Sequence, residues 1–377
     1  MIYWMVFLLS LFVLFVYSRV DYTKSTFCKF YVFIIIALGV FRDTTIGTDI
    51  MLSGGGHYYA LWKSPPSGLT HSEYGFLVLT SYLKTLVNSY YFYYGSIFAM
   101  TMGMYFFAAK KFGINPAVFF SIFFISSTIT SSYNIIRQIF TLSACVLVFS
   151  YFLYDVNFET GKNARISYFK IAIYEMLIML LAIGFHTSTI ILVLLPLFHI
   201  SYIQKFLSRD AVLWILLVLV VSVSFRYSDQ IHEYIIMANS VLGLGERADF
   251  WAEVVENYGE NINSSHGIGT TIIFGSIAIL ASRGKRNLLF FIGFIGLLLS
   301  NLASVNLGTV GRVFNNLSIF LIFYYAQIFG ELLNSYTIYK TDFRWAIVML
   351  FIITWTYNFY IRTIMSPSIS PYKTYLF

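Results

Sequence analysis

SSYNIIRQ (residues 131–138) opens the stretch that decides how this chain is read, and IFTLSACVLVFSYFLY (residues 139–154) follows it directly. The apolar run predicts one membrane-spanning helix. A guanidinium at the centre of a bilayer costs about 2.5–3.5 kcal/mol on insertion scales. Arg137 lies only about one turn inside this helix, next to Asn134 and Gln138. At this depth Arg137 can face a wet cavity at the membrane rim.

The chemistry of Arg137 leaves two interpretations open. A guanidinium presents a planar fork of five donors, which suits phosphate or carboxylate groups. A lone Arg at this depth can equally extend to lipid headgroups or pair with a nearby carboxylate. The rest of the chain has to decide between a binding residue and a structural one.

The composition is that of an integral membrane protein. Of 377 residues, 58% are hydrophobic, 20% are aromatic and only 11% are charged, whereas a soluble domain carries about 25% charged residues. The net charge of +7 implies no nucleic-acid partner, because most basic residues fall in loops where membrane topology favours them. Cys28 lies at a loop edge and Cys145 in an apolar run, so neither a disulfide nor a metal site is indicated.

The hydropathy pattern predicts an all-α fold: a polytopic helical bundle forming a single transmembrane domain over residues 1–377. About twelve transmembrane helices are expected, with one re-entrant or interfacial helix and one larger periplasmic loop. The first apolar run lacks the features of a signal peptide, so it is counted as a span. The candidate spans are 2–17, 27–41, 92–109, 114–130, 135–153, 169–185, 187–203, 211–226, 269–282, 287–304, 313–330 and 345–361.

The positions of Lys and Arg orient these spans. With the loops around 19–29, 110–111, 162–170, 205–209, 283–286 and 340–344 in the cytoplasm, residues 42–91 form an external loop. The apolar run Tyr74–Val87 within it contains Lys84, so we interpret it as re-entrant or interfacial. A full span there would instead place Arg19, Lys24 and Lys29 outside. The acidic segment 227–268 is a second, large external loop, either a lid or a solvated surface loop.

This topology gathers polar residues at the external face. The segment FRDTTIGTDI (41–50) supplies Arg42 and Asp49, and HSEYGF (71–76) supplies Glu73. Further along the chain, FHTS (185–188) supplies His186. The segment GRVFNN (311–316) supplies Arg312 and Asn315. Only Glu175 is expected near the middle of the membrane.

These motifs carry a family resemblance. The order is an FR…GTD loop, an acidic-x-GF turn, an N-x-x-RQ helix start, a later FHTS and a GR…F helix start, with SPSISPYKTYLF (366–377) at the end. That order resembles the EpsG-like branch of the Wzy O-antigen and exopolysaccharide polymerases. The turn here reads EYGF where acidic-Pro-Gly-Phe is common, so Tyr74 is expected to alter how the following helix begins.

The resemblance implies a bacterial inner-membrane glycosyltransferase that joins undecaprenyl-pyrophosphate-linked oligosaccharide repeat units at the periplasmic face. Both donor and acceptor would be lipid-linked, a separate chain-length-regulating co-polymerase would be a partner, and no cofactor is implied. Such an enzyme must stabilise a departing pyrophosphate and deprotonate a sugar hydroxyl.

The candidate residues follow from that chemistry. The pyrophosphate-binding candidates are Arg137 and Arg312, with Arg42 a weaker third. His186, Asp49 and Glu73 compete as the base, because His titrates near neutral pH and carboxylates also accept protons. Metal ligation is not expected, because no His or carboxylate pair has helical i,i+4 spacing on the external face. The proposed glycan-positioning residues are Asn134, Gln138 and Asn315.

Two other functions compete with the polymerase. A flippase for the same lipid-linked glycan needs polar groups along a path through the bilayer and broken helices near its middle, whereas here polar residues concentrate at one face. An O-antigen ligase shares the donor and is separated poorly by sequence. The RQ and GTD motifs and the modest 227–268 loop favour the polymerase.

Overall fold

The structure is a computed structural model that describes residues 2–18, 20–43, 46, 57–63, 74–133, 135–154, 167–226, 265–282, 285–304, 308–332, 344–366, 369 and 372. These residues are helical apart from short connections, and they contain no β-strand. The chain divides into two compact units, Met1–Pro196 with Ile322–Phe377, and Leu197–Leu321. Each unit is described by itself, and the single domain expected from the sequence stays a prediction.

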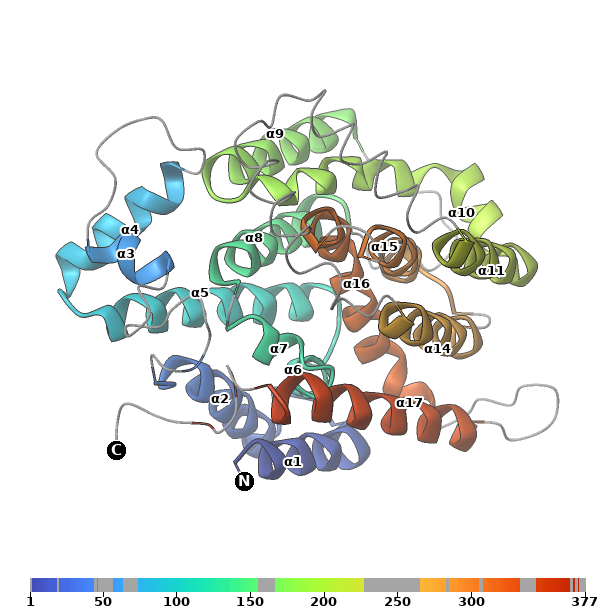
Figure 1. Cartoon of the computed structure of the whole chain (residues 1–377), viewed down its shortest axis with the longest axis horizontal. Helices are drawn as coiled ribbons and strands as arrows, with labels where there is room; N and C mark the ends of the chain where they lie inside the picture. The colour runs from blue at the N-terminus through green and yellow to red at the C-terminus, as the bar shows by residue number, and fades with distance from the viewer. Residues whose placement is uncertain are drawn as a thin grey trace. The chain divides into compact units, whose positions relative to one another are not determined.

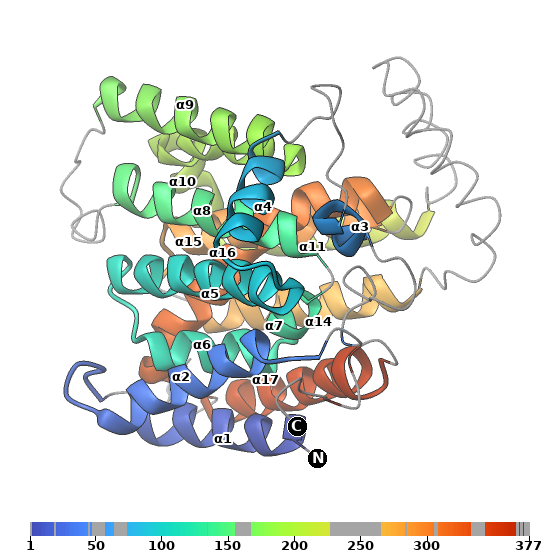
Figure 2. The same cartoon turned by 90° about the vertical axis from the view of Figure 1, so that its left-hand side faces the viewer.

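The first unit holds most of the helices, drawn in Figures 1 and 2. They are α1 (Ile2–Tyr17), α2 (Thr26–Val40), α3 (His57–Lys63), α4 (Tyr74–Leu86), α5 (Tyr90–Lys111), α6 (Pro116–Ile125), α7 (Thr128–Ser131), α8 (Ile136–Phe152), α9 (Tyr168–Gly184), the 3₁₀-helix η3 (Thr187–His199), α17 (Arg344–Phe359) and the π-helix η5 (Tyr360–Ile364). Both views show α5, α8 and α9 stacked one on the next, and α8 contacts both neighbours.

Several helices begin at a polar residue placed directly before an apolar run. The side chains of Ser25, Ser89, Asn115 and Ser167 each accept a hydrogen bond from a backbone N–H in the first turn of α2, α5, α6 and α9. Such capping satisfies donors that the helix itself leaves unpaired, and it is worth about 1 kcal/mol per helix. The cap residues therefore fix where these four helices start.

The first unit has two chemically different ends. At one end Asn115 Nδ2 donates to the carbonyl oxygens of Tyr17 (3.4 Å) and Val20 (2.8 Å), and Lys111 lies over the ring of Tyr151. Because α5 has 22 residues, its length of about 33 Å separates this end from the tyrosines at its start. The α5 start, the α8 start and the α9 end lie at the other end, called here the arginine end.

The fourth predicted span, 114–130, is interrupted. Helix α6 stops at Ile125, and Ser127 takes a positive φ of 62° before α7 begins. The side chain of Thr363 in the π-helix η5 lies at this break, where its Oγ1 donates to Ser127 Oγ (3.1 Å) and hydrogen-bonds Thr130 Oγ1 (2.8 Å). Irregular backbone inside a membrane protein has to find partners within the protein, and the carbonyl oxygen of Ser126 accepts from Asn358 Nδ2 at 3.0 Å. Two irregular segments therefore stabilise each other.

The seventh predicted span, 187–203, is not one straight helix. Residues 187–199 form η3, and the chain bends by 92° into α10 (Ser201–Leu207). Pro196 lies inside η3 and has no N–H to donate to the preceding turn. The hydroxyl of Tyr174 on α9 donates to the carbonyl oxygen of Leu192 at 2.6 Å, which joins η3 to α9.

The predicted re-entrant or interfacial run is the separate helix α4. Its 13 residues extend about 20 Å, less than the roughly 30 Å hydrocarbon core of a bilayer. In Figure 2, α4 runs across α5 and α9, both of which it contacts, rather than alongside them. The Lys84 ammonium donates to the carbonyl oxygens of Trp62 (2.9 Å) and Lys63 (3.2 Å), which end α3. A cation within an apolar run thus stabilises the carbonyl end of a neighbouring helix.

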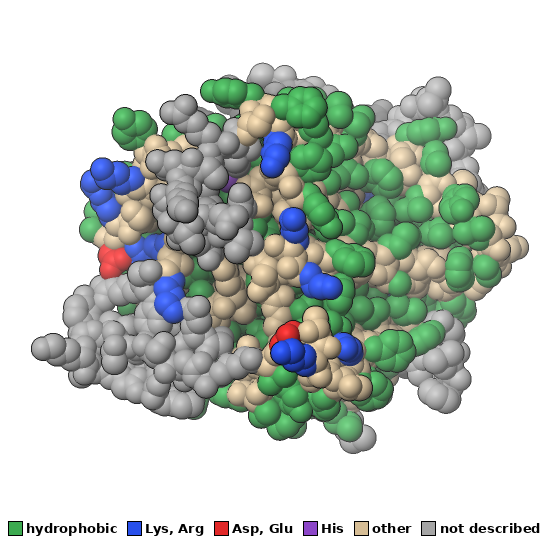
Figure 3. All heavy atoms as spheres, turned by 180° about the vertical axis from the view of Figure 1, so that it is seen from behind, with side chains coloured by type: hydrophobic (Ala, Val, Ile, Leu, Met, Phe, Trp, Pro, Cys, Tyr) green, Lys and Arg blue, Asp and Glu red, His purple; other side chains and the backbone are tan. Residues whose placement is uncertain are grey.

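The described surface is that of a membrane protein. Large apolar side chains such as Leu8, Phe33 and Ile183 are about three-fifths exposed on their helices, and apolar side chains gather on the right-hand side of the face drawn in Figure 3. Among the described residues, Ala346–Ile364 alone is long and apolar enough to cross a bilayer, and the bent pair 187–207 makes a second if it counts as one span. Eight further apolar helices have 10–17 residues, so the count of about twelve spans stays a prediction.

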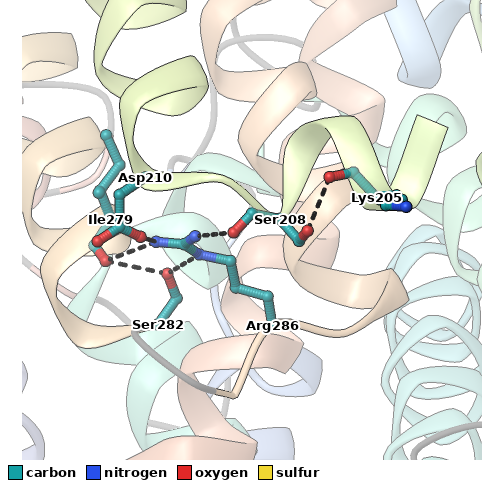
Figure 4. Close-up of polar contacts among 6 residues, drawn as sticks. All are labelled: Lys205, Ser208, Asp210, Ile279, Ser282 and Arg286. Carbon is teal, nitrogen blue, oxygen red and sulfur yellow. Dashed lines mark hydrogen bonds and ion pairs between the residues drawn. The ribbon is translucent and has the colours of Figure 1, made fainter. Parts of the chain in front are cut away.

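The second unit contains α10, α11 (Asp210–Arg226), α14 (Ser265–Ala281), α15 (Leu288–Ser304) and the start of α16 (Gly308–Leu332). Arg286 joins two of its loops, as Figure 4 shows. Its Nη2 lies 2.5 Å from Asp210 Oδ1, its Nη1 donates to the carbonyl oxygen of Ser208 (2.6 Å), and its Nε donates to Ser282 Oγ (3.0 Å). The loops before α11 and after α14, both predicted to be cytoplasmic, therefore meet at one end of these helices.

Candidate functional site

The start of α8 is held by a residue far away in the sequence. Ile135 occupies the N-cap position and supplies no capping side chain. The backbone N–H of Arg137, one of the donors that a helix start leaves unpaired, donates to the hydroxyl oxygen of Tyr58 at 3.2 Å. Helix α3, which carries Tyr58, is therefore docked on the first turn of α8.

The guanidinium of Arg137 lies against aromatic rings from two short helices. Its Cζ is 5.8 Å from the ring centre of Tyr58 on α3 and 5.9 Å from that of Phe76 on α4. The two rings are 6.2 Å apart, and the Arg137 side chain is partly buried. Ring faces attract a cation and restrict its position, so Arg137 is oriented at the arginine end while keeping access to solvent.

A close glycine contact brings the EYGF and FHTS motifs together. An added Cβ at Gly75 would lie 2.9 Å from the carbonyl oxygen of Gly184 and 2.9 Å from Cε2 of Phe185. Only glycine allows α4 to approach the end of α9 this closely. The ring of Phe185 also packs on Phe140 of α8, with centroids 5.7 Å apart. His186, the next residue, therefore lies at the same end of this unit as Arg137.

His186 is positioned by its backbone. Its carbonyl oxygen accepts hydrogen bonds from the N–H of Thr189 (3.2 Å) and from Thr189 Oγ1 (2.9 Å). Its side chain is partly buried. The imidazole is therefore attached to a fixed junction between α9 and η3.

An aromatic cluster underlies the arginine end. Its buried members come from α3, α4, α5 and α8: Tyr58, Phe76, Leu83, Tyr90, Tyr93, Tyr94, Ile97, Ile136 and Phe140. Tyr59, Trp62 and Phe185 pack against it from the side. Aromatic rings supply large apolar area with few rotatable bonds, so the cluster forms a stiff platform for Arg137.

Arg42 is enclosed rather than exposed. Its whole side chain is buried, and its Cζ lies 5.0, 5.2 and 4.6 Å from the ring centres of Tyr94, Phe98 and Tyr133. Nη1 donates to the carbonyl oxygen of Gly39 at 2.5 Å, and the Tyr94 hydroxyl donates to the carbonyl oxygen of Arg42. Burial lowers the pKa of the guanidinium from its ordinary value, which is so high that Arg keeps its charge in proteins.

The remaining predicted residues are placed as follows. Gln138 is buried in the first turn of α8. Asn315 is exposed on α16, where its Oδ1 accepts from Ser318 Oγ at 2.7 Å. Arg312 belongs to α16, but its side chain lies outside the described residues, as do Asp49, Glu73 and Asn134 entirely. Arg137 and Arg312 fall in different units, so the structure does not test whether they converge.

Sequence reasoning missed the residues that hold these groups in place. Tyr58 lies in the GGGHYYALW segment, and nothing in that segment indicates that its hydroxyl meets the backbone of Arg137. Tyr133 lies inside the SSYNIIRQ motif, and its ring packs on the buried Arg42. The PYK motif near the end of the chain offered a usable signal, because Tyr372 donates to the carbonyl oxygen of Leu38 (2.8 Å) beside Arg42.

The described part of the chain holds no group of three or more His, Cys, Asp or Glu side chains that could bind a metal ion. The arginine end is instead cationic and aromatic. It combines one partly buried guanidinium, a helix start, a histidine at a helix junction and many tyrosine rings. A guanidinium beside a helix start can bind an anionic group.

Comparison with known protein families decides the assignment. The model of the EpsG family matches residues 25–374, nearly the whole chain. The chain belongs to the EpsG family. This family is associated with glycosyltransferase-like polysaccharide polymerases, so the EpsG match supports a membrane protein with a polymerase-like activity. No curated protein and no solved structure matches the chain.

Proposed function

We propose that this EpsG-family protein is an O-antigen or related surface-polysaccharide polymerase of the bacterial inner membrane. It would join undecaprenyl-pyrophosphate-linked oligosaccharide repeat units by glycosyl transfer at the periplasmic face. In each cycle the bond between the anomeric carbon and the donor pyrophosphate breaks. An acceptor hydroxyl oxygen bonds to that carbon, its proton passes to a base, and undecaprenyl pyrophosphate leaves.

One observation carries this proposal: Arg137 lies at the start of α8, on an aromatic platform, at the end of its unit opposite Lys110 and Lys111. A helix start carries a positive partial charge of roughly half an elementary charge, which adds to the charge of the guanidinium. Positive inside-loop residues mark the cytoplasmic side, so the arginine end would be periplasmic. Charge-assisted hydrogen bonds from Arg to phosphate contribute roughly 1.5–3 kcal/mol each.

The donors at this end would act where charge develops. As the glycosidic bond breaks, negative charge accumulates on the leaving pyrophosphate, and preorganised donors stabilise it more than they stabilise the ground state. Arg137 is the first proposed ligand, and Arg312 is retained as the second for the same chemical reason. Gln138, Asn134 and Asn315 are proposed to position the glycan through amide hydrogen bonds.

His186 is the proposed base for the acceptor hydroxyl, with Asp49 and Glu73 as the competing carboxylates. A general base has to reach the proton that it removes and has to be unprotonated at working pH. The Gly75–Gly184 contact keeps His186 at the same end as Arg137, which favours His186 among residues that the structure describes. The other proposed partners are membrane lipid and a chain-length-regulating co-polymerase.

The alternatives make different phenotypic predictions. If the protein is a polymerase, deletion of its gene leaves single repeat units on the surface glycan acceptor. Loss of a ligase removes all repeats from lipid A–core, and loss of a flippase traps repeats on the cytoplasmic side. The deletion strain also serves as the host for variants.

The decisive variant is Arg137→Ala, with Lys111→Ala as its matched control at the opposite end of the unit. We expect Arg137→Ala to accumulate in the membrane at wild-type level but to give single repeats instead of a ladder on a glycan gel. Lys111→Ala should give the full ladder, because its exposed ammonium lies at the far end of α5. A full ladder from Arg137→Ala would exclude Arg137 as a pyrophosphate ligand.

A further inference from the structure

Arg42 was expected to bind substrate, yet its side chain is wholly buried. Among the residues that the structure describes, its Nε and Nη2 have no hydrogen-bond partner. A buried, charged donor without a partner is costly, so something must compensate for it. Three aromatic ring faces do so in part, because a ring face attracts a cation.

The end of α2 compensates for the rest of the charge. The last carbonyl groups of a helix have no partner inside it and carry a negative partial charge. Here the carbonyl oxygen of Ala37 accepts from the N–H of Phe41, that of Leu38 from the Tyr372 hydroxyl, and that of Gly39 from Arg42 Nη1. Arg42 therefore completes the cap of α2 at the arginine end.

Arg42 also fixes α2 to α5. Tyr94 and Phe98, one turn apart on α5, both face the guanidinium, and the Tyr94 hydroxyl bonds the Arg42 carbonyl group. The added Cβ of a residue at Gly39 would overlap the ring of Phe98 at 2.0 Å. Side chain and backbone of Arg42 are thus held by the same two turns of α5.

The third ring connects Arg42 to the candidate site. Tyr133 is wholly buried and its ring centre is the nearest of the three to Arg42 Cζ, at 4.6 Å. Tyr133 lies four positions before Arg137, in the connection between α7 and α8. Ile135 provides no side-chain cap for α8, and the N–H of Arg137 donates to the Tyr58 hydroxyl.

We infer that Arg42 is a positioning residue: its guanidinium, seated between the end of α2 and the ring of Tyr133, sets the α8 start and thereby the place of Arg137. Arg42 does not touch the substrate in this arrangement. Charge alone is not enough for this task, because a planar guanidinium can lie on ring faces and bond Gly39 at once, whereas a Lys ammonium acts as a point donor. The FR motif then positions the RQ motif, because Arg42 belongs to the first and Arg137 to the second.

The structural test is hydrogen exchange on the full-length protein in detergent or nanodiscs. In Arg42→Gln, amides of residues 132–138 should exchange roughly tenfold faster, and those of residues 108–115 at the opposite end should not change. The conservative variant Arg42→Lys should give an intermediate rate. Tyr105→Leu is the matched control, because Tyr105 is another wholly buried tyrosine whose loss should leave residues 132–138 unaffected.

The functional test rests on the proposed polymerase activity and uses a double-mutant cycle. Arg42→Gln and Tyr133→Leu should each lower kcat/KM for the lipid-linked repeat unit at least tenfold. The double variant should be no slower than the slower single variant, because both act through one contact.

Three results would overturn the inference. Unchanged exchange in residues 132–138 of Arg42→Gln would show that Arg42 does not hold the α8 start. Faster exchange throughout the unit would show a general role in folding. If the double variant loses kcat/KM by the product of the two single losses, Arg42 and Tyr133 act separately. If the wild-type protein polymerises nothing, the proposed function fails while the exchange experiment still decides the inference.

Discussion

Gly75 at the start of α4 lies against Gly184 at the end of α9, so closely that a Cβ on Gly75 would come within 2.9 Å of the Gly184 carbonyl oxygen. The contact is backbone to backbone, so neither side can move away by changing a rotamer. It joins helix α4, which carries Phe76, to the junction that carries His186. The candidate site thus depends on a residue with no side chain.

We expect Gly75→Ala to push α4 off α9 and to reduce polymer length. Overpacking of this kind costs about 1–3 kcal/mol. The measurement is the melting temperature of the purified protein together with the glycan ladder of the complemented deletion strain. Gly103→Ala on α5 is the control, because nothing lies within 4 Å of its added Cβ, and a helical Gly→Ala change contributes up to about 1 kcal/mol of stability. Equal behaviour of the two variants would contradict the close contact.

The sequence predicts the helices better than their interruptions. Each of the twelve apolar runs contains a helix in the described structure, because long apolar runs without strand punctuation have few other solutions in a membrane. The break at Ser127 was not predicted. Ser127 takes a positive φ there, and its hydroxyl accepts from Thr363, 236 positions further along the chain. No local pattern indicates such a partner.

In the candidate site, too, sequence indicates some features and misses others. Arg137 could be selected as a candidate because a guanidinium one turn inside an apolar helix is unusual in any membrane sequence. The enclosure of Arg42 was not recognisable, because its ring partners Tyr94, Phe98 and Tyr133 are ordinary aromatic residues among many. Composition identifies polar residues in a loop, but only tertiary packing shows which of them are buried.

Lys84→Met should loosen α3 without unfolding the unit. The Lys84 ammonium bonds the carbonyl oxygens of Trp62 and Lys63, and hydrogen bonds to a charged group contribute about 1.5–3 kcal/mol. A freed α3 would hold Tyr58 less firmly on the backbone of Arg137. We expect faster hydrogen exchange in residues 57–63 and shorter glycan chains.

Lys63→Met is the control for Lys84, because Lys63 contributes its carbonyl group and has an exposed side chain. The same substitution there should leave both exchange and chain length near wild type. If Lys84→Met matches wild type as well, the cap on α3 contributes nothing to the site.

Tyr174→Phe should lower the melting temperature, because it removes the buried hydrogen bond that joins α9 to the carbonyl oxygen of Leu192 in η3. A buried hydrogen bond contributes about 0.5–1.5 kcal/mol to stability. Tyr105→Phe removes a buried hydroxyl elsewhere and should be nearly neutral. Equal melting temperatures for Tyr174→Phe and the wild type would show that this hydrogen bond does not stabilise the junction.

His186→Gln should slow polymerisation while preserving the junction between α9 and η3, because Thr189 bonds the backbone carbonyl of His186 and not its ring. A positioned base contributes typically 10²–10⁴-fold to a rate, so a loss in that range is expected with purified lipid-linked repeats. His199→Gln, the same change at the other end of η3, should keep the wild-type rate. A wild-type rate in His186→Gln would leave the carboxylates Asp49 and Glu73 as the candidates for the base.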